Sequence, residues 1–155
     1  MKITGVIITY NEERNIERCL RSLKMVCDEI IVLDSFSTDG TEEICKEQQV
    51  TFVQHAFDGH IQQKNRALQL AQTDWVLSLD ADECLTPALT ASILQVKKQP
   101  LADAYSFNRL TNYCGHWVKY CGWYPDTKTR LARKEVAEWQ GVNPHDRLEL
   151  IHAGQ

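Results

Sequence analysis

Two aspartates separated by a single residue are the sharpest chemical feature of the sequence. Asp80 and Asp82 follow the apolar run from Trp75 to Leu79, whose composition is typical of a buried strand. Carboxylates at the end of such a strand project into one crevice, where they repel each other. A hard divalent cation such as Mg²⁺ or Mn²⁺ relieves that repulsion and bridges carboxylates to diphosphate oxygens. The pair predicts a metal site, and a turn of solvated or helix-capping acids is the alternative.

Polar residues also stand at the ends of two other predicted strands. Thr9, Tyr10 and Glu12 stand at the end of the first apolar run, and Asp34 ends the second. Because ligands bind beyond the carboxyl ends of the strands in an open α/β sheet, these residues are candidates to line the same crevice. The Asp34 carboxylate can accept hydrogen bonds from a base N–H or a ribose hydroxyl, and Tyr10 can stack on a nucleobase. The alternatives are an Asx turn at Asp34 and a simple rim aromatic at Tyr10.

Three further side chains have types that suit group transfer. Lys64 lies in a predicted helix with few acidic neighbours and can meet a phosphate, although a lysine on a helix is usually only solvated. Asp146 can act as a general base that deprotonates an acceptor hydroxyl. His145 can orient that base or ligate the metal. The alternative for this last pair is a surface turn with the sequence Asn-Pro-His-Asp.

These candidate residues depend on a particular order of elements. Apolar runs predict strands, and apolar residues spaced at three and four predict helices. The predicted strands are 3–9, 29–34, 51–54, 75–80, 104–109 and 129–133, and the predicted helices are 16–23, 41–48, 61–71 and 87–98. Because the first four strands are continuously apolar and separated by helices, they predict a parallel sheet covered on both faces. The fold class is therefore α/β.

An aromatic, glycine-containing segment runs from Tyr113 to Tyr124, between the last two predicted strands. Its aromatic residues suit either a platform for a sugar or a local core. Cys114, His116 and Cys121 lie in the same segment, but their spacing fits no common structural zinc pattern and a fourth ligand is not evident.

Composition limits the class of protein. The 155 residues amount to one domain of 17.8 kDa, with 43% hydrophobic and 25% charged residues, as in soluble globular proteins. No apolar run approaches the length that a bilayer requires. The net charge of −4 argues against a nucleic-acid partner. The start of the chain lacks an export signal, which predicts a cytoplasmic location and reduced cysteines, with Cys19 and Cys45 as small core residues.

The loop after the first strand excludes two common nucleotide-binding motifs. It contains neither G-x-G-x-x-G nor the lysine motif of a P-loop, so a dinucleotide-binding domain and a P-loop NTPase are poorly supported. Taken in order, the motifs instead resemble those of the family 2 glycosyltransferases, which have the GT-A fold. The segments that carry the similarity are VIITYNEE (6–13), IVLDS (31–35), DGT (39–41), KN (64–65), LDADE (79–83), GWYPD (122–126), RL (130–131) and VNPHD (142–146).

The resemblance implies a fold and a set of roles. The fold would be a GT-A-like, Rossmann-like three-layer sandwich with a mostly parallel central sheet. Thr9, Tyr10, Glu12 and Asp34 would bind the donor nucleotide, and Lys64 would approach its base or diphosphate. In the D-x-D motif, Asp80 would contact ribose or metal, and Asp82 would bind Mg²⁺ or Mn²⁺ directly. Residues 1–100 would form the nucleotide-sugar half of a single domain spanning 1–155, and residues 101–155 the acceptor half.

The later motifs are similar to those of the subgroup that builds lipopolysaccharide core. That subgroup implies inverting transfer of a hexose, most often glucose, from a nucleotide-diphosphate sugar to a saccharide or glycolipid, with peripheral contact at the inner membrane. It usually has His-Glu where this chain has His145 and Asp146. Relatives often continue beyond the position of Gln155, which leaves open a truncated domain or a minimal transferase. A nucleotidyltransferase and a non-catalytic nucleotide-sugar-binding module are the alternative functions.

Overall fold

The structure is a computed structural model, and it describes residues 1–143 and 145–151. The strands are β1 (Ile3–Thr9), β2 (Glu29–Asp34), β3 (Thr51–Gln54), β4 (Trp75–Asp80), β5 (Ala104–Arg109), β6 (Thr111–Tyr113), β7 (His116–Val118), β8 (Asp126–Arg133), β9 (Ala137–Val142) and β10 (His145–Leu150). The helices are α1 (Ile16–Leu23), α2 (Thr41–Glu47), α3 (His60–Leu70) and α4 (Pro87–Lys98), and a 3-10 turn spans Lys134–Val136.

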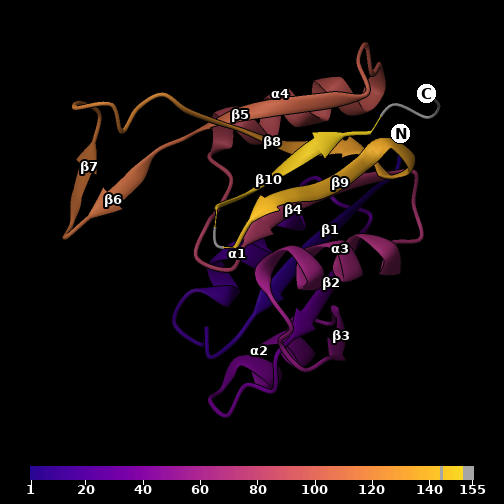
Figure 1. Cartoon of the computed structure of the whole chain (residues 1–155), viewed down its shortest axis with the longest axis vertical. Coiled ribbons are helices and arrows are strands. Elements are labelled where there is room, and N and C mark those ends of the chain that lie inside the picture. The colour runs from indigo at the N-terminus through magenta and orange to yellow at the C-terminus, as the bar shows by residue number, and fades with distance from the viewer. Residues whose placement is uncertain (144, 152–155) are drawn as a thin grey trace.

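One six-stranded sheet in the order β3-β2-β1-β4-β8-β5 organises the chain (Figure 1). Strands β1 to β4 are mutually parallel, whereas β8 runs antiparallel to β4 and to β5. The register places Thr9 beside Asp34 and Ile8 beside Asp80. The carboxyl ends of β2, β1 and β4 are therefore neighbours along one edge of the sheet, which confirms the predicted mostly parallel arrangement.

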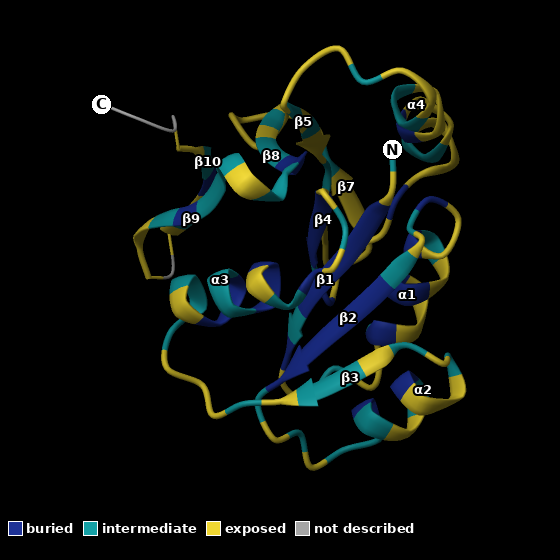
Figure 2. Cartoon of the chain, turned by 90° about the vertical axis from the view of Figure 1, so that its right-hand side faces the viewer, coloured by how far each residue is buried: buried dark blue, intermediate teal, exposed yellow. Residues whose placement is uncertain are grey.

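Two apolar clusters fill the two faces of this sheet and make three layers. On one face, Ile7 and Leu77 pack with residues of α1 and α4, including Leu20 and Ile93. On the other face, the strands pack against α3 and the β9–β10 pair. Figure 2 shows the buried strands β1, β2 and β4 between these outer layers. The three-layer prediction is confirmed.

The thiols of Cys19 and Cys45 are buried and unpaired, as predicted for small core residues. Burial among apolar side chains raises the pKa of Cys45 to about 12, so this thiol is a packing group without nucleophilic character.

The second part of the chain differs most from the sequence-based expectation. Strand β8 begins at Asp126 rather than at residue 129. The hairpin β6–β7, whose first strand begins at Thr111 and whose second strand lies in the aromatic segment, projects from the body (Figure 1). The antiparallel pair β9–β10 was not predicted. Among its described residues, the only buried apolar ones are Trp139 and Leu148, so it lacks the apolar run by which a strand is detected. Asp146 consequently lies in a strand rather than in a surface turn, and Pro144 of the predicted turn lies outside the described residues.

Among the described residues, no helix combines the length and the apolar character needed to cross a lipid bilayer.

Candidate functional site

A buried lysine joins two aspartates from separate parts of the chain. The Lys64 Nζ, on α3, lies 2.9 Å from Asp80 Oδ1 at the end of β4 and 2.7 Å from Asp146 Oδ2 on β10. It also lies 4.2 Å from the centre of the Trp139 ring on β9. The side chains of Lys64 and Asp146 are only 8% and 7% exposed. The structure thus brings together three of the predicted site residues, which are 16 to 82 positions apart in sequence.

Arg130 pairs with the second carboxylate oxygen of Asp80. Its Nη2 lies 3.1 Å from Asp80 Oδ2 and 2.8 Å from Glu83 Oε1. Burial raises the pKa of Asp80, but the charges of Arg130 and Lys64 and their hydrogen bonds outweigh burial and lower it to about 2. Burial raises the pKa of Glu83, against the opposing charge of Arg130. Each oxygen of Asp80 therefore faces its own cation.

The lowered pKa of Asp80 predicts a specific acid sensitivity. Because the pKa falls from 3.8 in the unfolded chain to about 2 in the folded one, its contribution to stability is complete above pH 4 and is lost as the pH falls toward 2. Allowing for the partial exposure of this side chain, we expect about 0.5–1 kcal/mol of that contribution to be lost between pH 6 and pH 3. Urea unfolding of wild type and Asp80→Asn at both pH values measures it. Equal pH dependence in the two proteins would contradict the assignment.

Asp82 has a different environment from Asp80. Its side chain is exposed, and its backbone oxygen accepts a hydrogen bond of 2.9 Å from Arg18 Nη2. Within residues 1–143 and 145–151, no cation or hydrogen-bond donor of the chain engages the Asp82 carboxylate. The same residues contain no cluster of three or more acidic, histidine or cysteine ligands. Since Mg²⁺ is commonly bound by one or two carboxylates together with substrate phosphates, the free Asp82 carboxylate fits that mode.

Thr9 and Asp34 lie side by side at the carboxyl ends of β1 and β2. The fully buried Asp34 carboxylate accepts hydrogen bonds from the Ser37 hydroxyl, from the Ser37 backbone N–H at 2.8 Å and from Gln54 Nε2 at 3.3 Å. The turn considered as the alternative for Asp34 is therefore present. Thr9, beside it, has a buried hydroxyl with no partner in the described part of the chain. A buried hydroxyl without a partner is costly, and a ligand that bonds it would remove that cost.

The remaining predicted residues have different environments. Tyr10 is 59% exposed and free to contact a ligand. Glu12 accepts a hydrogen bond of 2.9 Å from Asn15 Nδ2, and its backbone N–H donates to Thr41 Oγ1. His145 is exposed, and among the described residues it is not gathered with the aspartates into a metal-binding group.

Sequence reasoning missed Trp139 and gave no site role to Arg130. Both are buried, and Arg130 Nη1 and Trp139 Nε1 have no hydrogen-bond partner within the described residues. The guanidinium carbon of Arg130 lies 5.8 Å from the Trp139 ring centre. The sequence carried two signals for Arg130. It precedes the apolar pair Leu131 and Ala132 in a predicted strand, where a charge needs a buried partner, and it belongs to a segment that resembles family 2 glycosyltransferases.

Solved structures define the class of fold. The crystal structure of residues 1–349 of TarS from S. aureus superimposes with a TM-score of 0.64 and 20% sequence identity, covering 88% of this chain and 48% of that one. The architecture is that of the GT-A glycosyltransferases, with a mostly parallel central sheet.

Sequence comparisons identify the family. The profile of glycosyl transferase family 2 matches residues 4–145. An uncharacterised glycosyltransferase of Rickettsia prowazekii (strain Madrid E) is 38% identical over 142 residues, covering 89% of this chain and 48% of that protein. The SPbeta prophage-derived glycosyltransferase SunS of Bacillus subtilis (strain 168) is 34% identical over 160 residues, covering 97% of this chain and 36% of SunS. The chain belongs to glycosyl transferase family 2.

The chain is much shorter than these relatives. It spans 35% to 48% of the lengths of the matched Rickettsia glycosyltransferases. The lipopolysaccharide core biosynthesis glycosyltransferase LpsC of Rhizobium meliloti (strain 1021) is 34% identical over 94 residues, which covers 57% of this chain and 34% of LpsC.

Proposed function

We propose that the chain forms the nucleotide-sugar-binding and catalytic part of an inverting hexosyltransferase. The donor would be a nucleotide-diphosphate sugar, with glucose as the expected hexose. The acceptor would be a saccharide or glycolipid of lipopolysaccharide core or another cell-envelope glycan, reached from the cytoplasmic side of the inner membrane. One observation carries the proposal: Asp34, Thr9 and Asp80 end three adjacent strands, and Asp82, whose carboxylate no described residue engages, follows them.

The carboxyl ends of β2, β1 and β4 lie in the order in which the nucleoside, the diphosphate and the sugar of a donor would bind. A nucleoside at β2, with Asp34 and Tyr10, would place its diphosphate across β1 toward Asp82, where Mg²⁺ or Mn²⁺ suits carboxylate and phosphate oxygens. The Thr9 hydroxyl, which has no hydrogen-bond partner among the described residues, lies at the end of β1 between these two ends. TarS has been crystallised with UDP and with UDP-GlcNAc. Uridine nucleotides are therefore the first donors to test on this chain. The LpsC similarity favours an envelope glycan as the product.

The proposed reaction is a single displacement. The Asp146 carboxylate takes the proton of the acceptor hydroxyl, whose oxygen bonds to the anomeric carbon while the bond from that carbon to the diphosphate oxygen breaks. Asp82 would hold the cation, which would supply positive charge for the leaving diphosphate. Lys64 balances the charges of Asp80 and Asp146 and sets their separation.

A thermal-shift titration tests donor binding first. UDP with Mn²⁺, at about 100 times its dissociation constant, stabilises the folded state by about 2.7 kcal/mol, which for a chain of this size raises Tm by roughly 5–10 °C. Asp34→Asn should reduce the shift, whereas the exposed Asp103→Asn should not. An absence of any shift with uridine, guanosine, adenosine, cytidine and thymidine diphosphates and their sugars would refute the proposal.

A product assay then separates the proposed function from its alternatives. Release of nucleoside diphosphate from a nucleotide sugar supports the transferase. Release of pyrophosphate from a nucleoside triphosphate supports a nucleotidyltransferase, and binding without turnover supports a non-catalytic module.

A further inference from the structure

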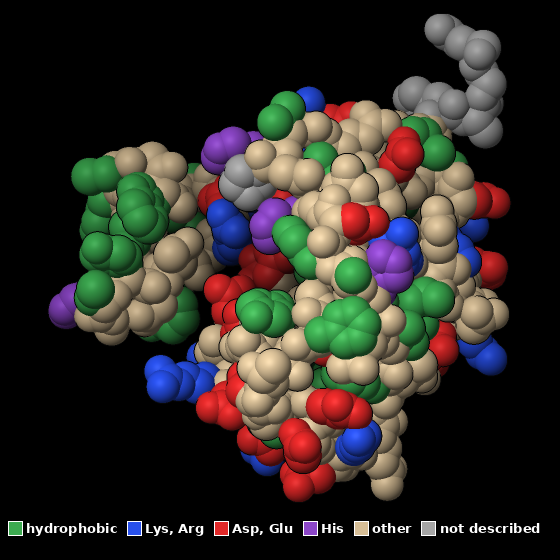
Figure 3. Space-filling view, turned by 60° about the horizontal axis from the view of Figure 1, so that its bottom comes forward, with side chains coloured by type: hydrophobic (Ala, Val, Ile, Leu, Met, Phe, Trp, Pro, Cys, Tyr) green, Lys and Arg blue, Asp and Glu red, His purple; other side chains and the backbone are tan. Residues whose placement is uncertain are grey.

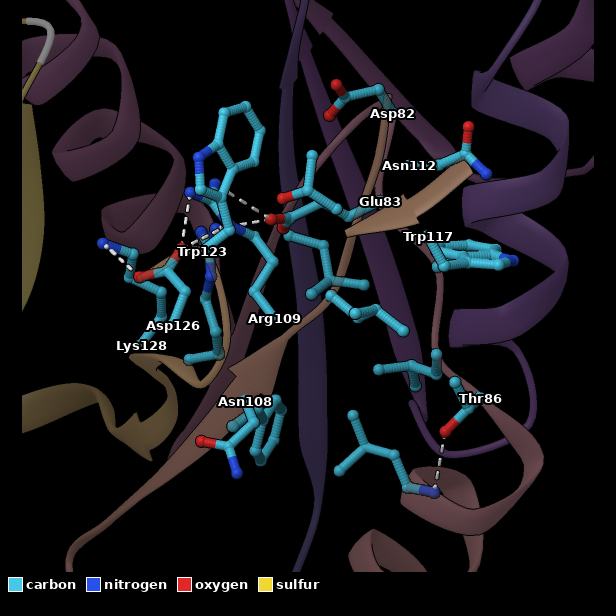
Figure 4. Close-up of a pocket in the computed structure, with 18 of the residues that line it drawn as sticks. Asp82, Glu83, Thr86, Asn108, Arg109, Asn112, Trp117, Trp123, Asp126 and Lys128 are labelled. Carbon is cyan, nitrogen blue, oxygen red and sulfur yellow. Dashed lines mark hydrogen bonds and ion pairs between the residues drawn. The ribbon is translucent and has the colours of Figure 1, made fainter. Parts of the chain in front are cut away.

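A second feature of the molecule is a cleft of about 1220 Å³ beside the loop that carries Asp82 and Glu83. It lies between the start of α4, strand β5 and the projecting β6–β7 hairpin region (Figure 4). Figure 3 shows the same hollow between the hairpin lobe and the body of the molecule, with acidic side chains at its floor. Two indole rings, Trp117 and Trp123, line it and are 62% and 47% exposed.

The position of the cleft continues the row of strand ends. Asp82 and Glu83 line it, and so does Arg130, which pairs with Asp80. Along the sheet, the order β2, β1, β4, β8, β5 runs from Asp34 to this cleft. A donor laid from β2 to β4 would therefore present its sugar at the mouth of the cleft. The volume exceeds what a single sugar needs, since pockets for drug-sized ligands span about 300–1,000 Å³.

The groups that line the cleft combine flat apolar faces with fixed polar groups. The indole rings flank Glu83 in the view of Figure 4. Arg109 Nη2 and Lys128 Nζ lie 2.7 Å and 3.1 Å from the two oxygens of Asp126, which holds this polar wall in place. A pyranose has C–H faces that pack on aromatic rings and hydroxyls that bond charged, planar groups at the ring edge.

We propose that this cleft is the acceptor-saccharide site, in which Trp117 and Trp123 stack on the sugar and the Arg109–Asp126 pair bonds its hydroxyls. The role of the bound saccharide as acceptor rests on the proposed function, whereas the binding of a saccharide in this cleft does not. The site would recognise the sugar ring, so a free oligosaccharide and the saccharide part of a glycolipid are both compatible with it.

Indole resonances of the wild-type chain test the binding directly. The chain has four tryptophans, of which Trp75 is buried, does not line the cleft and serves as the internal reference. Glucose, N-acetylglucosamine and glucuronic acid are titrated into ¹⁵N-labelled protein without donor. We expect at least one of them to shift the indole N–H signals of Trp117 and Trp123 saturably and to leave the Trp75 signal in place. No saturable shift with any sugar, or equal shifts at Trp75, Trp117 and Trp123, would overturn the proposal.

Variants then assign the contact. Saturation-transfer signals of the bound sugar should fall at least fivefold in the double variant Trp117→Ala with Trp123→Ala, and should largely return with phenylalanine at both positions. Tyr120→Ala is the matched control, because Tyr120 is 80% exposed on the same projecting segment and does not line the cleft. Full signals in the double alanine variant would overturn the assignment.

The acceptor role is tested separately from sugar binding. With a donor present, a sugar that binds should raise nucleoside diphosphate release above the rate with water alone. If it binds without raising an established release rate, the cleft is not the acceptor site. If no donor binds, the proposed function fails while the indole shifts still decide whether the cleft binds saccharide.

Discussion

Replacing Lys64 with methionine will lower the free energy of unfolding by about 3 kcal/mol, the scale measured when one partner of a buried ion pair is removed. Methionine keeps the length of the apolar stem but leaves Asp146 buried without a cation and Asp80 with Arg130 alone. It also removes the ammonium from the Trp139 ring. Urea unfolding at pH 7 measures the change as a shift in midpoint at constant slope.

Two controls separate this effect from a general loss of lysine. Lys46→Met removes an exposed pair with Glu42 on α2, and we expect no measurable change, because exposed pairs contribute little. Adding Asp146→Asn to Lys64→Met removes the unbalanced carboxylate and should restore part of the lost stability. If Lys64→Met is as stable as wild type, or if Asp146→Asn lowers stability further by its full single-mutant cost, the two side chains are not coupled.

The elements through α4 could be predicted because each shows its pattern within its own residues. Strands β1, β2 and β4 are runs of buried apolar residues, and α1 places Ile16, Cys19, Leu20 and Leu23 on one buried face. Thr86 accepts a hydrogen bond from the Leu89 backbone N–H, so the predicted start of α4 is confirmed. Adjacent parallel strand ends then follow from topology, which is how Thr9, Asp34 and Asp80 could be placed at one edge.

The other part of the site depends on contacts that no local pattern contains. Trp139 is the single buried residue of β9, and Arg130 begins a buried run of three residues near the end of β8, so neither strand shows a regular pattern. Each gains its site contacts from α3 or β4. Likewise, nothing near Asp80 in sequence shows that Lys64 and Arg130 hold both of its oxygens. From the sequence, Asp80 and Asp82 were therefore predicted to form one metal-binding pair. In the structure, two cations balance the charge of Asp80, whereas no described residue pairs with the carboxylate of Asp82.

Of the two aspartates, Asp82 is the one whose replacement has the largest expected effect on activity. Asp82→Asn should lower the release of UDP from a nucleotide sugar by at least 100-fold, comparable to the loss of one group that stabilises transition-state charge. Asparagine keeps the shape of the side chain and one oxygen but removes the negative charge that a divalent cation requires. The part of the UDP thermal shift that depends on Mn²⁺ should disappear in the same variant.

Stability distinguishes this effect from damage to the fold. Because the Asp82 carboxylate has no partner within the described residues, Asp82→Asn should unfold at the same urea concentration as wild type. Asp80→Asn should be less stable at pH 7, since it leaves Lys64 and Arg130 facing a neutral group. Asp103→Asn, on an exposed aspartate far along the chain, is the control for charge alone and should change neither property. Wild-type UDP release by Asp82→Asn in the presence of a chelator would show that neither Asp82 nor a cation supports the reaction.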